Sequence, residues 1–516
     1  MIHTYRDLTR DRRVTADVCV VGTGCGGATL GAWLAEAGLR VVFLERGGSY
    51  TKLDFDQREL DMLPKIDGGR GLDASVDMSV GLTYGNNVGG ASVHYWADSY
   101  RTPADRLVRW RDEFGLEGHS ESDLAPHFEV LERDLHVHPA TDDYFNEMNR
   151  LLKVGGERLG WHGARVPQAR HGCVRSGFCM QGCAYDAKQS QLVTFVPRAL
   201  AHGADIYADT RADTLEWDAA RRRVVALTGR VLDRATGLPT GRTVRVDARA
   251  FVLAAGGYGT PLFLLKSGLR ERLPAVGKHT VCNPCPMVHA IFEQEIIQFR
   301  GIPAAWGIEH WRLARYRGGR YEEGGYLLMA NQLQPATLAA VLPGVGSAHA
   351  ELMMQLRHLG GTICWIDDAD FGHMELDADN HPEIHVPIDG TNGAMIRDSL
   401  LKQARLLFAV GAKEVLFGDD RDTRIRRASE IDRAVRALRI RPASLTLAAP
   451  HPAGGARMGR DAATSVVGMD HRVHGTDNLW VSDPSVFPNG PSVDPSLTIM
   501  AFSAIATRHV REALGH

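Results

Sequence analysis

The sequence predicts an α/β fold in which a Rossmann-like domain is assembled from separated segments of one chain. Three segments predict it: residues 16–48, 249–268 and 478–514 each combine an apolar β-rich run, a glycine-containing turn and a helical stretch. Strands that alternate with helices in this way form a parallel sheet. Because long stretches of sequence separate the three segments, the chain between them is expected to build a second domain.

The positions of these segments set the predicted domain boundaries. Residues 399–413 have helical periodicity, and residues 221–249 have the pattern of a charged β-hairpin, so the chain between the three units carries both helices and strands. We therefore expect the second domain to be α+β. The first domain is expected to comprise residues 1–110, 186–283 and 446–516, and the second domain residues 111–185 and 284–445.

Length and composition exclude several classes of protein. A chain of 516 residues with 44% hydrophobic and 23% charged residues has the composition of a globular protein with more than one domain. Its net charge of −3 argues against charge-driven binding to nucleic acid or to anionic lipid. No stretch approaches the ~20 apolar residues that span a bilayer, and residues 1–18 lack the apolar core of a secretory signal. We therefore expect a cytoplasmic protein without a transmembrane segment.

The most informative segment is residues 16–48, in which a strand, a glycine turn, an Ala/Leu-rich helix and a second strand follow one another. Gly22 is expected to make the tight turn, Gly24 to let backbone amides approach a pyrophosphate, and Gly27 to let the helix pack closely on the strand. Glu45 ends the second strand and is placed to accept hydrogen bonds from a ribose diol. The motif therefore predicts a dinucleotide site, although by itself it does not distinguish FAD from NAD.

The C-terminal unit suggests a family. Residues 451–510 begin with HPAGGARMG and contain VSDPSVFPNGPSVDPSLTIM, and residues 88–96 read VGGASVHYW. Together with the N-terminal fingerprint, they resemble the glucose–methanol–choline flavin oxidoreductases over essentially the full length. This resemblance implies FAD as cofactor, a flavin-binding domain, a substrate domain whose sheet covers the flavin, and oxidation of an alcohol to a carbonyl.

The chemistry of alcohol oxidation indicates which residues act. Removing the hydroxyl proton near pH 7 requires a base, and histidine has a suitable ordinary pKa. His451 stands at the catalytic position of the family that the chain resembles, in a His-Pro-x-Gly motif. The second catalytic position, His or Asn in that family, is Asp494 here, and an ionised carboxylate can only accept a hydrogen bond. Asp494 is therefore expected to be protonated, to point away, or to share the work with His451; we favour the last, with His451 taking the hydroxyl proton and Asp494 orienting the alcohol.

The resemblance also implies further contacts to the flavin. His94 lies in a run similar to the segment of pyranose oxidases whose histidine bonds covalently to the flavin, whereas related sugar dehydrogenases carry a similar pair without that bond. We expect His94 to pack beside the flavin without a covalent bond. The other implied cofactor-binding residues are Gly89, Gly90, Ser92, Asp483, Pro495 and Ser496.

Three cysteines form a separate feature. Eight cysteines in the whole chain are too few for a disulfide scaffold, but Cys173, Cys179 and Cys183 cluster with the spacing C-x5-C-x3-C. The segment resembles the Cys-rich turn of long-chain alcohol oxidases, where it would be a structural loop with buried, inert thiols near the flavin. It is also similar to the loop of bacterial FAD glucose dehydrogenases, where three cysteines hold an iron–sulfur cluster. A zinc site would need a fourth ligand such as His171. We predict no bound metal.

The sequence is least informative about the substrate. Apolar, Met-containing stretches at 325–347 and at Met353–Met354 suit a hydrophobic or bulky alcohol, although ordinary core would account for most of them. The alternative is a sugar or polyol dehydrogenase or a pyranose-oxidase-like enzyme, with an iron–sulfur cluster at the three-cysteine loop. The electron acceptor, whether O2, a quinone or a partner protein, is not indicated.

Overall fold

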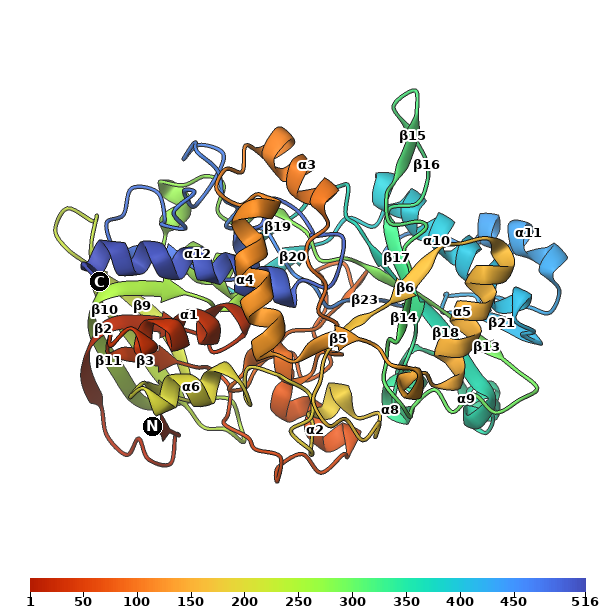
Figure 1. The fold of residues 1–516 in the computed structure, drawn as a ribbon, viewed down its shortest axis with the longest axis horizontal. Helices are drawn as coiled ribbons and strands as arrows, with labels where there is room; N and C mark the ends of the chain where they lie inside the picture. The colour runs from red at the N-terminus through yellow and green to blue at the C-terminus, as the bar shows by residue number, and fades with distance from the viewer.

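The computed structural model describes all 516 residues, which form two large sheets arranged along the long axis of the molecule (Figure 1). Both chain termini lie at the end that contains the first sheet. The combination of a mainly parallel sheet and a second, antiparallel sheet with covering helices confirms the predicted α/β fold class.

The first sheet is built on parallel strands. Valine-rich β2 is buried along its second half and pairs in parallel with β3 on one side and with β11 on the other. Strand β11 is long, so that β24 pairs in parallel with its last residues while β10 pairs antiparallel with its first ones. The strands are β1 (Ile2–His3), β2 (Arg12–Val21), β3 (Val41–Leu44), β8 (Asp205–Tyr207), β9 (Thr210–Trp217), β10 (Val224–Leu232), β11 (Pro239–Leu253) and β24 (Leu479–Val481). The predicted hairpin at 221–249 is therefore β10 and β11.

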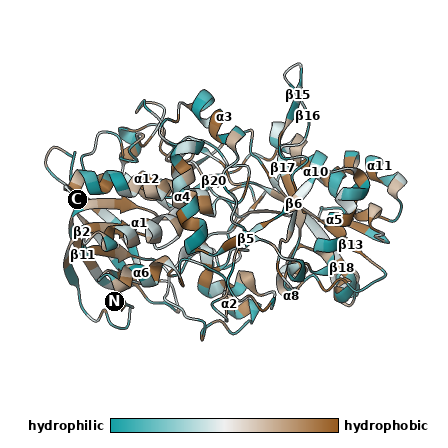
Figure 2. Ribbon diagram, viewed as in Figure 1, coloured by the Kyte–Doolittle hydropathy of each residue, from teal (hydrophilic) through white to brown (hydrophobic).

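Apolar helices cover this sheet. Helix α1 (Cys25–Glu36) packs against α12 (Ser496–Leu514) and α6 (Phe195–Ala201), and α4 (Glu121–Asp134) packs against α12. Helix α7 (Gly256–Lys266) follows β11 directly. Figure 2 shows hydrophobic residues along the strands of the first sheet and hydrophilic residues on surface helices such as α3 (Ala104–Phe114). No helix is both long enough and apolar enough to cross a membrane.

The second sheet is mainly antiparallel. Strands β13, β18 and β17 form its centre, and the helices α5 (Glu147–Leu159) and α10 (Gly390–Ala409) cover one face. Helix α10 contains most of the helix predicted at 399–413 but begins nine residues before it, and it ends at Ala409. The strands are β4 (Gly81–Leu82), β6 (Gly163–Arg165), β13 (Cys285–Ile291), β14 (Trp306–Ile308), β17 (Tyr326–Ala330), β18 (Leu359–Ile366), β21 (Glu414–Phe417), β22 (Arg424–Ile425) and β23 (Leu447–Ala449).

The remaining elements are small. A three-stranded sheet contains β12 (Lys278–Thr280), β19 (Gly372–Leu376) and β20 (Pro382–His385), and two strand pairs are β5 (Val137–Pro139) with β7 (Pro167–Ala169) and β15 (Arg315–Arg317) with β16 (Arg320–Glu323). The other helices are α2 (Glu59–Ile66), α8 (Pro335–Val341), α9 (Gly346–Met353) and α11 (Ile431–Ala437).

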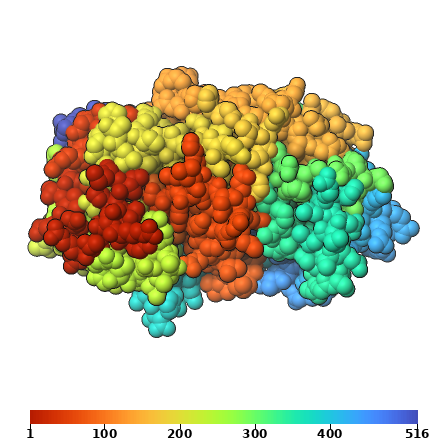
Figure 3. Space-filling model, turned by 90° about the horizontal axis from the view of Figure 1, so that it is seen from below, coloured from red at the N-terminus to blue at the C-terminus, as the bar shows by residue number.

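Several segments connect the two sheets. The short strands β4 and β23 lie within ranges predicted for the first domain, yet they extend the second sheet through β13. Buried Glu59 of α2 accepts the backbone N–H groups of Ala336 and Thr337, both at 2.7 Å, and so caps α8. Figure 3 shows the orange-red segment that follows the first 50 residues between the red N-terminal residues and the teal segment with α8 and α9. The predicted domain boundaries therefore remain a proposal.

Candidate active site

Three turns meet at one edge of the first sheet. They follow the carboxyl ends of the parallel strands β2, β11 and β24, and lead to α1, α7 and α12. In open α/β sheets this edge is where ligands bind. Helices α1 and α12 also point their N-termini toward it, where backbone N–H groups favour negative charge.

The glycines of the first turn have different surroundings. Gly22 has a φ of +98°, and a Cβ there would lie 2.3 Å from the Ala254 carbonyl oxygen. A Cβ on Gly27 would lie 2.2 Å from the Gly22 carbonyl oxygen, and one on Gly26 only 1.7 Å from the Ser482 carbonyl oxygen. These three glycines permit close backbone packing. A Cβ on Gly24 would meet only the Gly90 Cα, at 3.8 Å, so Gly24 faces open space of the kind that a pyrophosphate needs.

Glu45 joins this turn from the end of β3. Its Oε2 accepts the backbone N–H and the hydroxyl of Thr23 at 2.9 and 2.7 Å, and its Oε1 accepts the Gly47 N–H at 2.8 Å. Burial raises the pKa of Glu45, while these three hydrogen bonds oppose that shift. The second oxygen keeps capacity for a further donor, as a ribose-binding carboxylate requires.

The Gly89–Ser92 segment lies against the same turn. Gly89 donates its N–H to the Thr23 hydroxyl at 3.0 Å, and a Cβ on Gly90 would lie 2.6 Å from the Gly24 Cα. The Ser92 hydroxyl donates to the Gly89 carbonyl at 2.6 Å and accepts the Gln191 N–H at 2.9 Å. Ser92 therefore has protein partners for its hydroxyl, and it braces the loop.

His94 follows this segment and is buried. Burial, with a smaller effect of the Lys188 charge, lowers the pKa of His94 to about 3, so its ring is neutral near pH 7. The Nε2 atom of His94 has no hydrogen-bond partner in the protein. A buried, unpartnered ring nitrogen is what a histidine beside a bound cofactor would show.

A second group of residues forms the chemical part of the site. His451, two residues after β23, places its Nε2 3.3 Å from Oδ1 of Asp494, and both side chains are nearly buried. The His451 Nδ1 and the Asp494 Oδ2 have no hydrogen-bond partner in the protein. The Trp365 ring lies 5.2 Å from the His451 ring, so one side of the pair is apolar. The fold thus brings together the two residues that the sequence predicts as catalytic.

The pair has a buried acidic neighbour that sequence reasoning missed. Asp98 is 1% exposed, and burial together with the charge of Asp494 holds the pKa of Asp98 well above its ordinary value. Its Oδ1 accepts a hydrogen bond from Gln168 at 2.6 Å, and its backbone carbonyl accepts one from Ser496 at 3.2 Å. Nothing in the sequence ADSYR distinguished this acid from a surface residue.

Replacing Asp98 with asparagine should stabilise the protein more at pH 8 than at pH 4. The pKa of Asp98 is raised in the folded state, whereas an unfolded aspartate ionises near pH 4, so folding loses stability as the pH rises above that value. The loss amounts to about 1.4 kcal/mol per pH unit until the folded carboxyl ionises. Asparagine cannot ionise and removes this loss. Thermal unfolding of the FAD-loaded proteins at both pH values tests this, and a pH-independent difference in Tm would contradict it.

Asp483, Pro495 and Ser496 complete the predicted set. The Asp483 carboxylate accepts hydrogen bonds from Ser485 N–H at 2.9 Å and Gly256 N–H at 3.0 Å, and from the Thr260 hydroxyl. Its side chain therefore fixes the start of α7. The cofactor contact expected of Asp483 stays a prediction. Pro495 precedes the first residue of α12, Ser496.

Comparison with known proteins identifies the family. Two models described as GMC oxidoreductase match residues 43–285 and 368–503, which together cover most of the chain. A GMC-type oxidoreductase of Mycobacterium tuberculosis is 32% identical over 515 residues, which cover 97% of this chain and 76% of the relative. The chain belongs to the GMC oxidoreductase family.

A more distant sequence relative and a solved structure are also similar to this chain. A long-chain-alcohol oxidase of Arabidopsis thaliana is 24% identical over 518 residues, covering 96% of this chain and 68% of the relative. The solved structure of Aspergillus oryzae formate oxidase superposes with a TM-score of 0.72 at 15% identity, over 98% of this chain and 99% of that structure, and shows the same fold. This GMC protein is an FAD-dependent oxidoreductase.

The residues at the sheet edge fit FAD. Three features support this: the open space beside Gly24, the Oε1 of Glu45, which can accept a further donor, and the unpartnered Nε2 of His94. Hydrogen bonds of Thr23 to Glu45 and to Gly89 connect the 22–24 turn with both other segments. Sequence reasoning missed two contributors, Thr23, which links Glu45 to Gly89, and Gly26. Both residues lie inside the 22–27 glycine motif, and this position could have identified them as part of the site.

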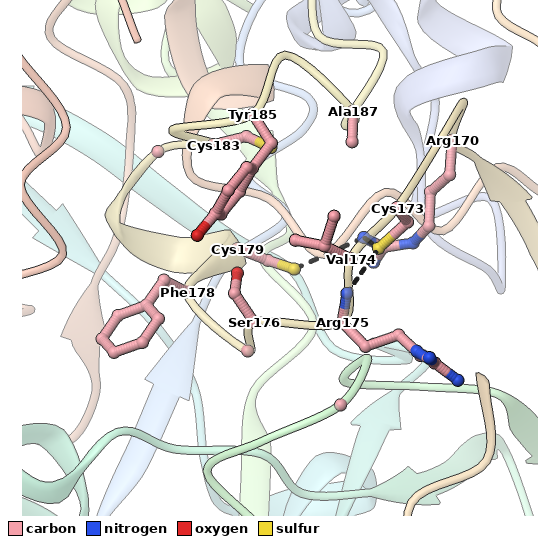
Figure 4. Close-up of a pocket in the computed structure, with 13 residues that line it drawn as sticks. Arg170, Cys173, Val174, Arg175, Ser176, Phe178, Cys179, Cys183, Tyr185 and Ala187 are labelled. Atoms are coloured by element: carbon pink, nitrogen blue, oxygen red, sulfur yellow. Dashed lines mark hydrogen bonds between the residues drawn. The ribbon is translucent and has the colours of Figure 1, made fainter. Parts of the chain in front are cut away.

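The three cysteines line one surface pocket, shown in Figure 4. Arg170 Nη1 donates to the sulfur atoms of Cys179 and Cys173, at 3.4 and 3.8 Å. Cys179 is buried, but Cys173 and Cys183 are only partly buried, so the expectation of uniformly buried thiols is wrong. Gly172, Gly177 and Gly182 in this loop have positive φ angles, so they allow the tight turns between the cysteines.

The pocket does not have the geometry of a zinc site. The three sulfur atoms do not all lie within 4.8 Å of one another, whereas sulfur atoms that share one zinc at ~2.3 Å must lie closer together than that. Buried Lys188 instead ties the loop to the flavin-side segment, because it donates to the carbonyls of Cys179 at 2.5 Å and of Tyr95 at 3.0 Å. That anchoring supports a structural role, and the prediction that the loop holds no metal stays a prediction.

Proposed function

We propose that this GMC oxidoreductase oxidises the CH–OH group of a hydrophobic or bulky alcohol to a carbonyl. The observation that carries the proposal is the pairing of His451 with Asp494 against the Trp365 ring. When bound, FAD supplies the acceptor for the hydride.

The chain's own residues handle the proton. The alcohol hydroxyl carries a single proton. On binding, the hydroxyl donates its hydrogen bond to the unpartnered Asp494 Oδ2, which orients the alcohol; it then turns to the unpartnered Nδ1 of His451, which takes up the proton. The Asp494 carboxylate, 3.3 Å from His451, attracts the positive charge that the imidazole acquires. The N-terminus of α12 begins two residues after Asp494 and favours negative charge there.

The surroundings of the pair favour a hydrophobic substrate. Trp365 contacts Trp96, with ring centroids 5.6 Å apart, and its indole N–H points at the Met329 sulfur at 3.3 Å. Met329 is therefore part of the apolar wall expected from residues 325–347, whereas Met354 is exposed and has no part in it. A sugar would meet this wall with hydroxyl groups that lack partners.

Anaerobic bleaching of the flavin tests the proposal. Long-chain alcohols, sterols, aryl alcohols and sugars are mixed separately with the purified yellow protein, and the loss of visible absorbance is followed. We expect hydrophobic alcohols to bleach the flavin faster than sugars at equal concentration. Bleaching by sugars alone would favour the sugar-dehydrogenase alternative, and no bleaching by any alcohol would reject the proposal. Repeating the reaction with O2 or a quinone then identifies the electron acceptor.

The cytoplasmic location of the protein stays a prediction.

A further inference from the structure

One face of the second sheet is turned toward His451. Antiparallel pairing sets Met287 opposite Ile363 and Ile363 opposite Met329, and alternate residues of a strand share a face. Trp365 is two residues beyond Ile363 on β18 and therefore lies on the same face, where its ring contacts His451. We call this the His451 face.

The part of the His451 face nearest the catalytic pair is apolar. Trp365 and Leu327 form its first row, and Met287, Ile363 and Met329 form its second row. All five are buried and belong to one hydrophobic cluster that is separate from the main core.

The third row of the same face is polar. His289 is paired with Gly361, and the Asn331 N–H donates to the Gly361 carbonyl at 2.9 Å, which continues the register beyond β17. His289 and Asn331 are each 1% exposed, and none of their four side-chain nitrogen and oxygen atoms has a hydrogen-bond partner in the protein. Leaving such buried groups unpaired is unfavourable, and folded proteins rarely do so without a reason.

Gly361 separates the two polar side chains. A Cβ there would lie 3.0 Å from the His289 Nδ1, so the glycine leaves room for the imidazole. Burial lowers the pKa of His289 to about 4, and the ring is therefore neutral near pH 7 with one donor and one acceptor. Asn331 adds both donors and an acceptor without charge. This pair suits an uncharged oxygen better than a carboxylate.

The polar row, His289, Gly361 and Asn331, lies far enough from the catalytic pair to contact the other end of a substrate. Gly361 and Trp365 are four residues apart on β18, which at ~3.3 Å per residue corresponds to about 13 Å. We propose that His289 and Asn331 bind a second, uncharged oxygen of the substrate, a hydroxyl or a carbonyl, at the end remote from the reacting alcohol. The substrate is then a lipophilic alcohol with a second oxygen function roughly 13 Å away. This inference rests on the proposed function, because it takes His451 as the site of alcohol oxidation.

A pair of matched substrates tests the inference. 1,10-Decanediol carries a second hydroxyl at about the required separation, and 1-decanol has a methyl group in its place. For the FAD-loaded wild type and for Asn331→Leu, kcat/KM for flavin reduction is measured with each alcohol, and the value for the diol is divided by the value for 1-decanol. We expect the ratio to fall about 5-fold in the variant, which corresponds to the loss of about 1 kcal/mol, the contribution of one neutral hydrogen bond. An unchanged ratio would show that the polar row binds only water and would overturn the inference.

Two controls keep the test decisive. Thr362→Val alters the opposite face of β18, where the Thr362 hydroxyl donates to Gln403 at 2.9 Å, and should leave the ratio unchanged. If neither alcohol bleaches the flavin, the proposed function fails. The binding site is then tested by thermal unfolding, in which the increase in Tm caused by 1,10-decanediol is compared with that caused by 1-decanol. A larger increase with the diol that disappears in Asn331→Leu would support the binding site; equal increases in both proteins would overturn it.

Discussion

Replacing His451 with alanine is expected to slow reduction of the flavin by an alcohol about 10²–10⁴-fold, the usual effect of losing a general base. The expectation rests on geometry, because the His451 Nε2 lies 3.3 Å from Asp494 and the His451 Nδ1 has no hydrogen-bond partner in the protein. Stopped-flow measurement of flavin bleaching under anaerobic conditions gives the rate. Reduction of His451→Ala at the wild-type rate would reject the active-site assignment.

Asp494→Asn is the matched variant for this test. Asparagine keeps the size of the side chain and one acceptor oxygen, but it lacks the charge that attracts a protonated His451. We expect a smaller loss of rate than in His451→Ala and a shifted pH profile of reduction. If both the rate and the pH profile stay unchanged, Asp494 has no part in the chemistry, and the hypothesis of shared roles is wrong.

Gly24→Val is expected to abolish FAD retention while the protein still folds. A Cβ on Gly24 meets no atom closer than the Gly90 Cα at 3.8 Å, so the valine side chain enters the open space where we place the pyrophosphate. The ratio of flavin to protein absorbance after gel filtration reports cofactor content, and circular dichroism reports the fold. A stable, fully yellow variant would refute this placement.

Gly26→Ala is the contrasting variant in the same turn. A single Cβ there would lie 1.7 Å from the Ser482 carbonyl oxygen, and backbone on both sides leaves little room for movement. We expect a loss of folded protein, or a fall in unfolding free energy of at least about 3 kcal/mol. Thermal unfolding with excess FAD measures it. A Tm close to that of wild type would show that the two turns are not held as closely as described.

The local pattern of the sequence was sufficient for the fold of the first domain. Residues 16–48 contain a complete βαβ unit, and its strand, turn and helix have the predicted types. The C-terminal helix, Ser496–Leu514, lies within the segment 478–514 in which the sequence predicts a helical stretch. These features are local, because hydrophobic periodicity and turn residues act over a few neighbouring positions. Long-range packing was less visible: β4 and β23 extend the second sheet, and α4 packs against α12, although the sequence predicts each in the other domain.

By itself, the sequence determined the family, the dinucleotide motif and His451 with Asp494 as the residues of interest. Only the tertiary structure decided what surrounds them, because contacts between residues hundreds of positions apart depend on strand order and register. The pairing of His451 with Asp494, the burial of Asp98 beside them, and the apolar wall that begins at Trp365 are of this kind. The polar row was also decided only by the tertiary structure, because antiparallel pairing of neighbouring strands aligns His289, Gly361 and Asn331.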